Sequence, residues 1–324
     1  MFEIVESRPL GPDVKRIVVR APRVARKQLP GQFVIVRVHD RGERIPLTIC
    51  DSDGGAGTIT LIVQGIGKTT RLINALEAGQ GLLDVVGPLG NPSEIRVHGR
   101  VVVVAGGVGV AIALPTARAL KDAGNHVDAI LGARAKDLVI LEAELRAASH
   151  TCIVTTDDGS HGRRGLVVDP LREFLRTGPP MDLVLAIGPI PMMRSVAEAT
   201  REAAIPTVVS LNSIMVDGTG MCGGCRVVVG DQARFACVDG PEFDAHQVDF
   251  GVLAQRNAMY RDAERVALER FREHPERDLE RVPRPLDSEP CRLAQRHPEW
   301  NLAAGDRTSA ESSHPDAILR DPTT

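Results

Sequence analysis

A cluster of cysteines with metal-ligand spacing is the strongest chemical signal in this sequence. Cys222 and Cys225 form a C-x2-C pair, Cys237 follows them, and Asp217 precedes them. The pattern D-x4-C-x2-C-x11-C matches the spacing of plant-type [2Fe–2S] sites, with Asp at the first ligand position. Glycines within residues 218–224 suit a loop whose backbone N–H groups point at bridging sulfides. The sequence therefore predicts that Asp217, Cys222, Cys225 and Cys237 hold an iron–sulfur cluster.

Two other interpretations of these cysteines stay open at this point. A C-x2-C pair also begins zinc sites, but no second such pair and no His pair follows at zinc spacing. His246 is only a lone candidate for a zinc ligand. The cysteines also fit a structural role without any metal. The glycine-rich setting and the four-ligand spacing favour the iron–sulfur cluster.

Composition argues against several other classes of protein. The net charge is −3 and aromatic residues make up 3% of the chain, so neither a basic surface nor stacking platforms for nucleic acid are expected. No apolar run reaches the length of a membrane span, and the first residues lack the features of a signal peptide. We therefore expect a cytoplasmic protein without nucleic-acid or membrane partners. In that compartment, clustered cysteines favour a metal over disulfides.

The distribution of apolar, glycine and charged residues divides the 324 residues into four parts. Short β-branched runs bounded by Gly, Pro and Asp predict an antiparallel β domain over residues 1–97. Alternating strands and helices predict a parallel, doubly wound α/β domain over residues 98–211. Residues 212–253 form a small module around the cysteines, which a metal centre would stabilise. Residues 254–324 begin as a charged helix and continue as a tail too poor in apolar residues to stay ordered.

A glycine-rich turn follows the most apolar run of the chain. Val101–Ala105 is typical of a strand buried on both faces, and Gly106–Ala111 (GGVGVA) leads from it into a helix. Such a turn lets backbone N–H groups approach a pyrophosphate at the start of the helix. Ile112 stands where the usual G-x-G-x-x-G fingerprint has its third glycine, so an ordinary tight turn is the competing interpretation. The position at the start of a doubly wound domain favours a dinucleotide site.

Two short segments of the β domain carry groups suited to a flavin and its diphosphate. Arg44–Thr48 (RIPLT) offers a guanidinium and a hydroxyl at a strand edge, although an edge Arg is usually only solvated. Gly65–Thr70 (GIGKTT) looks like a P-loop, but Ile62 replaces the glycine that a P-loop requires. We therefore reject nucleotide hydrolysis. A Gly-Lys-Thr-Thr turn that opens a helix can still hold a phosphate through its backbone donors and the helix dipole.

Taken in this order, the motifs resemble those of the ferredoxin-NADP reductase superfamily. Within it, the sequence is similar to the electron transfer subunits related to dihydroorotate dehydrogenase. Among these it most resembles the small (alpha) subunits of NADH-dependent reduced ferredoxin:NADP oxidoreductases, also described as sulfide dehydrogenase beta subunits. The resemblance covers about residues 1–260, and Asp217 replaces the cysteine of the orotate-linked branch. Besides the motifs above, it rests on Gly132–Leu138, on Asp157–Ser160 with Gly162 and Gly165, on Ala186–Met193, and on Val216–Cys225 with Phe235–Phe243.

The resemblance implies roles for individual residues. Ile187 occupies the position of a cysteine that often lies beside the nicotinamide in these reductases, so no thiol is expected to assist hydride transfer, and no catalytic residue is assigned. The resemblance implies that both flavin segments contact FAD. The first would do so through Arg44, Pro46, Leu47 and Thr48, and the second would contact the diphosphate through Gly67, Lys68, Thr69 and Thr70. Nicotinamide-nucleotide contacts are implied in three turns, at Gly107, Gly109, Asp157, Gly188, Pro189 and Met192.

These assignments imply a path for electrons. A nicotinamide gives two electrons as hydride and a [2Fe–2S] cluster takes one at a time, so a flavin belongs between them. The carboxylate of Asp217 is a harder ligand than a thiolate and is expected to alter the potential of the cluster. The resemblance implies a larger partner subunit, with FAD and iron–sulfur clusters, of the glutamate-synthase small-chain type. With that subunit, the complex would couple NADH, NADP and ferredoxin, and electron bifurcation is one form of such coupling.

Two other functions and one uncertainty about the nucleotide accompany this prediction. The chain also fits an electron transfer subunit of dihydroorotate dehydrogenase, against which Asp217 speaks. A third interpretation is a non-enzymatic iron–sulfur redox sensor. Arg134 follows the second strand of the α/β domain, where a basic residue accommodates a 2′-phosphate, so NADP(H) stays open beside the NAD(H) that the resemblance favours.

Overall fold

The computed structural model describes residues 1–283 of the chain. Cys291 and Trp300, to which the sequence assigns no role, lie outside the described residues. The described part belongs to one unit in the contact map of the chain and contains two large sheets and a short hairpin.

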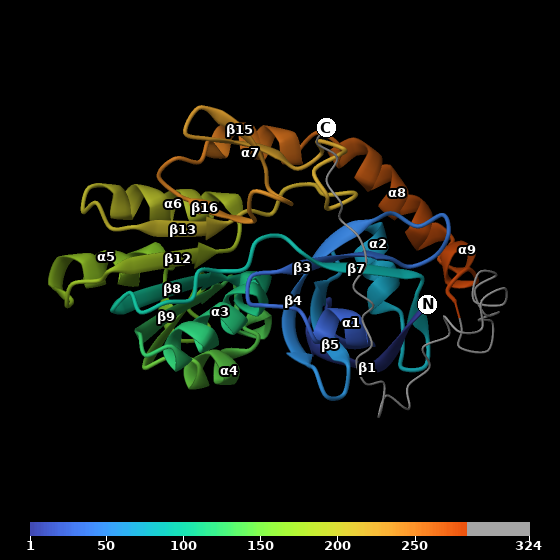
Figure 1. Ribbon diagram of the computed structural model, residues 1–324, viewed down its shortest axis with the longest axis horizontal. Coiled ribbons are helices and arrows are strands. Elements are labelled where there is room, and N and C mark those ends of the chain that lie inside the picture. The colour runs from blue at the N-terminus through green and yellow to red at the C-terminus, as the bar shows by residue number, and fades with distance from the viewer. Residues whose placement is uncertain (284–324) are drawn as a thin grey trace, which may run out of the picture. The chain divides into compact units, whose positions relative to one another are not determined.

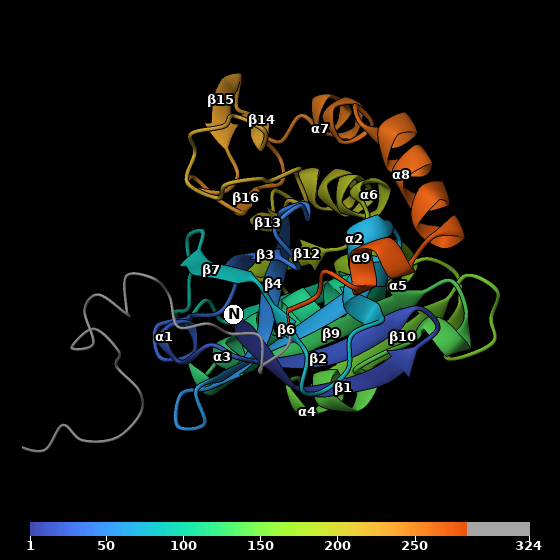
Figure 2. The ribbon, with the colours of Figure 1, turned by 90° about the vertical axis from the view of Figure 1, so that its right-hand side faces the viewer.

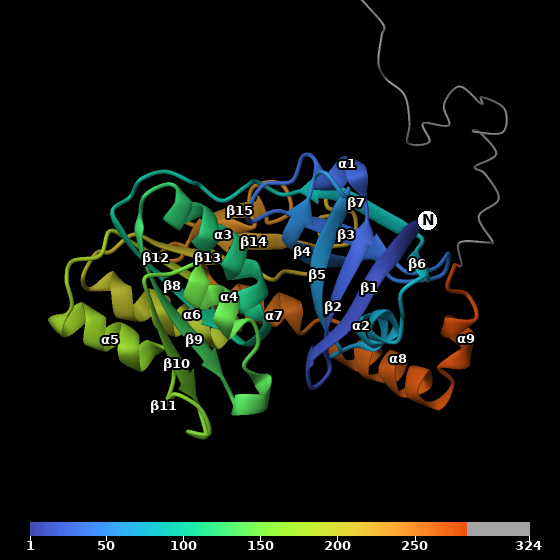
Figure 3. The same cartoon turned by 90° about the horizontal axis from the view of Figure 1, so that it is seen from below.

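The first sheet is antiparallel and contains seven strands in the order β6-β1-β2-β5-β4-β3-β7. The sheet curls into a nearly closed barrel, and its strands lie side by side in Figure 3. Its strands are β1 (Phe2–Gly11), β2 (Val14–Arg20), β3 (Phe33–Arg37), β4 (Ile45–Asp53), β5 (Thr58–Gln64), β6 (Gly81–Leu82) and β7 (Asp84–Leu89).

Cross-strand pairs of β-branched and leucine side chains fill the barrel. Ile17 lies opposite Leu61 and Val19 opposite Ile59, and all four side chains are buried. Such pairs across neighbouring strands are what stabilises a sheet of this kind. The sequence misses the first strand, β1, because its glutamates, arginine and proline hide the alternation of a half-buried strand.

The second sheet has the order β11-β10-β9-β8-β12-β13-β16, parallel except for the last pair. This order doubles back at β8, which is the point where open parallel sheets bind ligands beyond the carboxyl ends of their strands. Its strands are β8 (Arg100–Gly106), β9 (His126–Ala133), β10 (Thr151–Thr156), β11 (Arg163–Arg164), β12 (Leu183–Ile187), β13 (Thr207–Ser210) and β16 (Glu242–Asp244).

The alternation of valines in β8 separates two cores. Val101 and Val103 pack with the helices of one face, whereas Val102 and Val104 pack with those of the other. Figure 1 shows α3 and α4 on one side of the sheet and α5 and α6 on the opposite side. The helices on these two faces are α3 (Val110–Asp122), α4 (Glu142–Ala147), α5 (Val168–Thr177) and α6 (Ile190–Arg201). The antiparallel barrel and the doubly wound sheet confirm the predicted fold class.

The cysteine region is tied to the parallel sheet by its last strand. Cys225 and Cys237 flank a hairpin of β14 (Arg226–Val229) and β15 (Gln232–Phe235). The chain then returns as β16, in which Glu242 lies opposite Ser210 of β13. Sequence patterns do not indicate β16, because a strand of three residues is too short to show alternation.

The remaining helices lie near the barrel and the cysteine hairpin. The sequence predicts one helix over residues 255–272, but a turn at residues 258–260 separates two helices there. None of the helices within residues 1–283 is long and apolar enough to cross a bilayer. These helices are α1 (Pro22–Ala25), α2 (Lys68–Asn74), α7 (Phe250–Asn257), α8 (Arg261–Glu273) and α9 (Glu276–Leu279).

The sequence predicts no ordered element beyond about residue 274, whereas the structure places α9 there. The reason is packing: Phe271 and Val282 are buried in the core of the barrel, and Leu279 packs against it. Residues 284–324, the rest of the predicted tail, lie outside the described part of the chain.

A half-buried carboxyl group joins three segments far apart in the sequence. Glu242 Oε1 accepts a hydrogen bond from Ser93 Oγ at 2.6 Å, and Ser93 Oγ lies 2.9 Å from Thr116 Oγ1 of α3. Burial raises the pKa of Glu242, and the hydrogen bond from Ser93 opposes this only in part. The folded protein therefore disfavours the charged form of Glu242.

We expect Glu242→Gln to stabilise the protein at high pH. Because the folded pKa is raised, the contribution of Glu242 to stability is present in acid and is lost as the pH rises through that pKa. The neutral amide should therefore raise Tm by roughly 2–4 °C near pH 8, and the difference should vanish in acid. Calorimetry across pH, with the exposed Glu202→Gln as control, checks this. A gain in Tm that does not depend on pH would contradict it.

Candidate cofactor sites

The glycine turn after β8 leaves no room for side chains at one position. A Cβ on Gly109 would lie 2.4 Å from the carbonyl oxygen of Ile187, the last residue of β12. Gly107 has a φ of +55°, which favours glycine, but faces open space. The close approach of the turn to β12 is therefore the local reason for glycine at position 109.

All six residues implied for the nucleotide line one cavity of about 710 Å³. The cavity lies at the carboxyl ends of β8, β9, β10 and β12, as expected for an open parallel sheet. The barrel also contributes to its wall through Val14, Gln64 and Ile66. The predicted residues in the wall are Gly107, Gly109, Asp157, Gly188, Pro189 and Met192.

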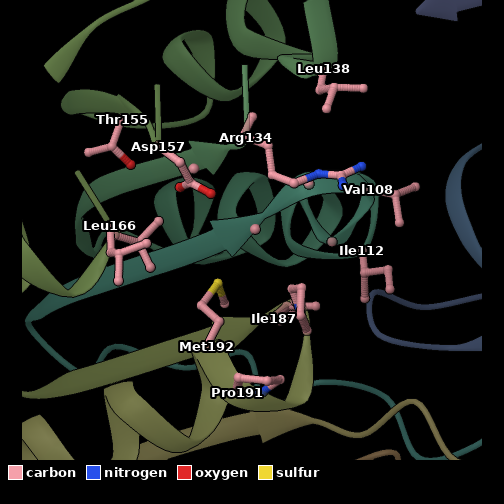
Figure 4. Close-up of a pocket in the computed structure, with 18 of the residues that line it drawn as sticks. Val108, Ile112, Arg134, Leu138, Thr155, Asp157, Leu166, Ile187, Pro191 and Met192 are labelled. Carbon is pink, nitrogen blue, oxygen red and sulfur yellow. The ribbon is translucent and has the colours of Figure 1, made fainter. Parts of the chain in front are cut away.

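Two charged side chains line this mostly apolar cavity. Arg134 follows β9 and Asp157 follows β10, and both belong to the cavity wall. Figure 4 shows Arg134 extending toward Val108, while the carboxylate of Asp157 lies nearer Thr155 and Leu166. A carboxylate hydrogen-bonds a ribose hydroxyl, and a guanidinium accommodates a phosphate. The cavity therefore offers groups for both parts of a nucleotide.

The two flavin segments meet at the start of α2. The hydroxyl of Thr69 donates a hydrogen bond to the carboxylate of Glu43, which precedes Arg44. Thr70 Oγ1 accepts a hydrogen bond from Gly67 N at 3.0 Å and closes the turn. The structure thus brings Glu43, which precedes the Arg44–Thr48 segment, against Thr69 of the 67–70 turn. Pro46, Leu47 and Thr48 lie on β4, opposite β3, and Lys68 begins α2.

Other groups already engage the polar side chains of this region. Lys68 Nζ lies 3.2 Å from Asp278 Oδ1 of α9. Arg44 is exposed, and within residues 1–283 its guanidinium has no hydrogen bond or ion pair. Sequence reasoning misses Asp278, because no local pattern links a residue of α9 to a turn about two hundred positions earlier. It misses Glu43 as well, because the contact of Glu43 with Thr69 joins two segments that no shared motif connects. Among the residues implied for FAD, and within residues 1–283, the exposed guanidinium of Arg44 is free to meet an anionic ligand.

The structure brings two of the four predicted cluster ligands together. Cys225 and Cys237 are buried, with their sulfur atoms 3.2 Å apart, at the base of the β14–β15 hairpin. Cys222 is exposed on the preceding loop. Burial, followed by the neighbouring Cys225, raises the pKa of Cys237 to about 12. Metal binding at this thiol must therefore displace a proton.

The carboxylate of Asp217 faces the backbone of the same loop. It accepts hydrogen bonds from the amides of Thr219 and Cys222, both at 2.7 Å. The amide of Thr219 first, and that of Cys222 with it, hold the pKa of Asp217 below its ordinary value. Within residues 1–283, no three His, Cys, Asp or Glu side chains already converge on one point as metal ligands do. Asp217 and Cys222 are therefore adjacent in the loop but not converged with the buried pair.

The donors of this loop fit an iron–sulfur cluster in kind. Three thiols and a carboxylate lie on one loop and hairpin, and Gly218, Gly220 and Gly223 have positive φ, which turns the backbone sharply around them. His246, the lone zinc candidate, instead has its Nε2 3.0 Å from Thr200 Oγ1 and is committed to that contact. The arrangement favours the iron–sulfur interpretation over zinc.

Comparison with known proteins agrees with this interpretation. Residues 212–249 match a family model described as the iron–sulfur cluster binding domain of dihydroorotate dehydrogenase B. A protein of Thermotoga maritima named as a homolog of the dihydroorotate dehydrogenase B (NAD(+)) electron transfer subunit is 47% identical over 83% of this chain and 95% of its own.

Solved structures extend the agreement to the fold. One chain, from a study of flavin-based electron bifurcation in an NADH-dependent reduced ferredoxin-NADP oxidoreductase, has a TM-score of 0.80 and 45% identity, over 84% of this chain and 98% of that one. A ferredoxin reductase of carbazole 1,9a-dioxygenase, 20% identical, has a TM-score of 0.53 over 63% of this chain and 65% of its own and shows the fold alone.

These likenesses confirm the predicted resemblance and the predicted class of function. The protein is an oxidoreductase component that transfers electrons, works with a partner subunit, and uses FAD, NAD(H) and a [2Fe–2S] cluster. The assignment of single residues to these cofactors stays a prediction. The chain belongs to the family of dihydroorotate dehydrogenase B electron transfer subunits and their homologues.

Proposed function

We propose that the chain takes electrons from NADH and delivers them, through FAD and its [2Fe–2S] cluster, to a larger subunit in a complex of the NADH-dependent ferredoxin:NADP oxidoreductase type. The observation that carries the proposal is the shared cavity. Its wall combines the nucleotide turns of the parallel sheet with Val14, Gln64 and Ile66 of the barrel. A nicotinamide bound in this cavity would therefore contact both the parallel sheet and the barrel.

Each cofactor has a proposed set of residues. Arg44, Pro46, Leu47 and Thr48 would hold FAD, with Gly67, Lys68, Thr69 and Thr70 at its diphosphate. Gly107, Gly109, Asp157, Gly188, Pro189 and Met192 would hold the nicotinamide nucleotide, and Asp217, Cys222, Cys225 and Cys237 the cluster. When bound, the flavin accepts electrons as a pair from the nicotinamide and passes them on singly to the cluster. We also propose that residues 1–97, 98–211 and 212–253 form the FAD, nucleotide and cluster domains, followed by residues 254–324.

The residues of the chain contribute binding and placement to this chemistry. The guanidinium of Arg44, exposed and unpaired within residues 1–283, would meet an anionic part of FAD. The backbone of the Gly107–Gly109 turn, held against β12, would present its N–H groups to the nucleotide phosphates. Ile187 lines the cavity in place of a thiol and keeps that part of the wall apolar.

The partner and the location belong to the same proposal. We infer a partner of the glutamate-synthase small-chain type, with FAD and iron–sulfur clusters of its own, and a cytoplasmic complex that couples NADH to NADP and ferredoxin. The similarity to a chain studied for flavin-based electron bifurcation supports bifurcation as the mode of coupling. Co-purification of the chain with its partner, followed by NADH-dependent reduction of NADP and ferredoxin, tests this.

A second function is favoured by the name of a relative. The Thermotoga maritima protein is named as a homolog of an electron transfer subunit of dihydroorotate dehydrogenase B. An orotate-linked complex would oxidise dihydroorotate and reduce NAD, whereas the complex proposed here would not respond to dihydroorotate. The two functions therefore separate by one substrate test on the purified complex.

We expect NADH to bleach the flavin absorption of the purified chain at least about tenfold faster than NADPH. The carboxylate of Asp157 in the cavity would repel a 2′-phosphate, and a tenfold preference corresponds to only about 1.4 kcal/mol. Anaerobic stopped-flow spectroscopy with both nucleotides measures it. Asp157→Asn should narrow the preference for NADH over NADPH, whereas the exposed control Glu202→Gln should leave it unchanged. Faster bleaching by NADPH would assign the cavity, through Arg134, to NADP(H).

A further inference from the structure

A helical segment connects the cysteine loop with the turn that begins α2. Residues 250–282, here named the strap, contain α7, α8 and α9. Figure 2 shows α7 beside the β14–β15 hairpin, α8 running toward α2, and α9 next to α2. The strap therefore contacts, with its two ends, the regions proposed to hold the cluster and the flavin.

The first end of the strap holds the backbone of the cysteine loop. Arg256 Nη2 lies 3.3 Å from the carbonyl oxygen of Gly224 and 3.4 Å from that of Gly223, the two residues between Cys222 and Cys225. The side chain of Asn257 donates to the carbonyl of Asn212 at 2.9 Å, at the start of the cysteine region. Phe250 and Leu253 of α7 are buried in the same core as Cys225 and Cys237.

The carboxylate of Asp278 holds the second end of the strap through contacts with the side chains of His39 and Lys68. Asp278 Oδ1 lies 3.1 Å from His39 Nε2 and 3.2 Å from Lys68 Nζ. His39 Nδ1 accepts a hydrogen bond from Arg41 N, so Nε2 carries the proton and donates to Asp278. His39 is 1% exposed and Asp278 17%, so water screens these contacts less than it screens a surface ion pair.

Apolar packing fixes the second end as well. Phe271 and Val282 are 8% and 5% exposed and belong to the core of the barrel, and Leu279 packs against that core. These side chains flank Asp278 in sequence. Loss of the carboxylate alone would therefore weaken the docking of α9 without removing the strap from the protein.

We infer that the strap sets the position of the α2 turn relative to the cysteine loop, and that Asp278 and Arg256 are positioning residues for the passage of electrons between flavin and cluster. The inference rests on the proposed function, which puts FAD at the α2 turn and the cluster at the cysteine loop. Placement is the contribution that a protein makes to transfer between cofactors. Neither residue lines the nucleotide cavity, and Asp278 reaches the FAD site only through Lys68. With FAD kept saturating, the loss of either residue should therefore slow electron transfer to the cluster far more than hydride transfer to the flavin.

Two variants and one matched control test the inference on the full-length chain with both cofactors. Asp278→Ala removes the contacts to His39 and Lys68, whereas Asp278→Asn keeps an acceptor for His39 and removes only the charge facing Lys68. Arg265→Ala breaks an exposed ion pair with Glu269 on the same strap, at 2.9 Å, and touches neither end. Arg256→Ala tests the opposite end.

NADH is mixed anaerobically with each protein in the presence of saturating free FAD, and the flavin and cluster absorption bands are followed separately. One NADH supplies two electrons as hydride; the flavin takes both, and one then moves to the cluster. We expect unchanged flavin bleaching and a cluster phase slowed at least about tenfold in Asp278→Ala and Arg256→Ala, because small misplacements cost large factors in rate. Asp278→Asn should be intermediate and Arg265→Ala normal.

Hydrogen exchange of α8 and α9 supplies a readout that does not depend on electron transfer. Loss of protection in Asp278→Ala with an unchanged cluster phase would overturn the inference, and so would full protection in that variant. If NADH fails to bleach the flavin of the unmodified chain, the proposed function fails, and exchange alone still shows whether Asp278 holds the strap. An equal slowing of flavin bleaching and cluster reduction in Asp278→Ala would also overturn the inference, because it would assign Asp278 to the flavin site itself.

Discussion

Cys222→Ala and Cys225→Ala will abolish the visible absorption of the [2Fe–2S] cluster, whereas Asp217→Cys will retain it with a changed potential. Each alanine removes one of four predicted ligands, and a cluster of this kind needs all four. A thiolate in place of the Asp217 carboxylate keeps the ligand number and changes only the softness of the donor. Absorption and electron paramagnetic resonance spectra of the anaerobically purified proteins measure both effects.

The two alanine variants separate ligation from folding. Cys225 is buried in a core with Cys237, so its truncation also removes packing, whereas Cys222 is exposed and its truncation does not. Cys152→Ala, a half-buried cysteine on β10, is the control and should keep the full spectrum. An unchanged spectrum in Cys222→Ala or Cys225→Ala would refute the ligand assignment.

Gly109→Ala will lower the rate of flavin reduction by NADH by about a hundredfold, because misplacing a reactant by about one ångström costs a factor of this size. The added Cβ would meet the carbonyl oxygen of Ile187 at 2.4 Å, and backbone cannot yield as a side-chain tip can. The turn must then move away from β12, and the proposed phosphate site moves with it. Stopped-flow bleaching of the flavin by NADH measures the loss.

Two further glycine variants show whether space is the cause. At Gly107 an added Cβ meets nothing, and only its φ of +55° opposes alanine, so Gly107→Ala should cost about tenfold or less. Gly54 lies in the hairpin between β4 and β5, where the atom nearest to an added Cβ is 4.0 Å away. NADH should therefore reduce the flavin of Gly54→Ala at the normal rate. Bound FAD should be unchanged in all three. Normal reduction in Gly109→Ala would remove this turn from the nucleotide site.

The parts of the fold that the sequence predicts are those encoded over short distances. Val101–Ala105 and the following glycines suffice for β8 and its turn, because a strand buried on both faces is apolar throughout. The spacing from Asp217 to Cys237 similarly predicts a ligand set. Strands such as β1 and β16 carry too few alternating residues to be recognised, and their place depends on partners such as β2 and β13.

The candidate sites are less predictable where side chains meet from distant segments. The six nucleotide residues come from several turns, and only the order of the parallel strands brings them to one cavity. No local pattern places Arg256 on the carbonyls of Gly223 and Gly224, or Asp278 on His39 and Lys68. Such contacts depend on the path of the chain, so they appear only in the folded structure.

The closeness of Cys225 and Cys237 also determines how the cluster-free protein responds to air. Their sulfur atoms are 3.2 Å apart, and a bonded pair requires about 2.05 Å. Oxygen can take two electrons from the two thiols, which release two protons and join as a disulfide. That bond would occupy half of the predicted ligands and block cluster assembly until a reductant opens it. A chain that loses its iron in air is therefore expected to need thiol reduction before iron and sulfide can rebuild the centre.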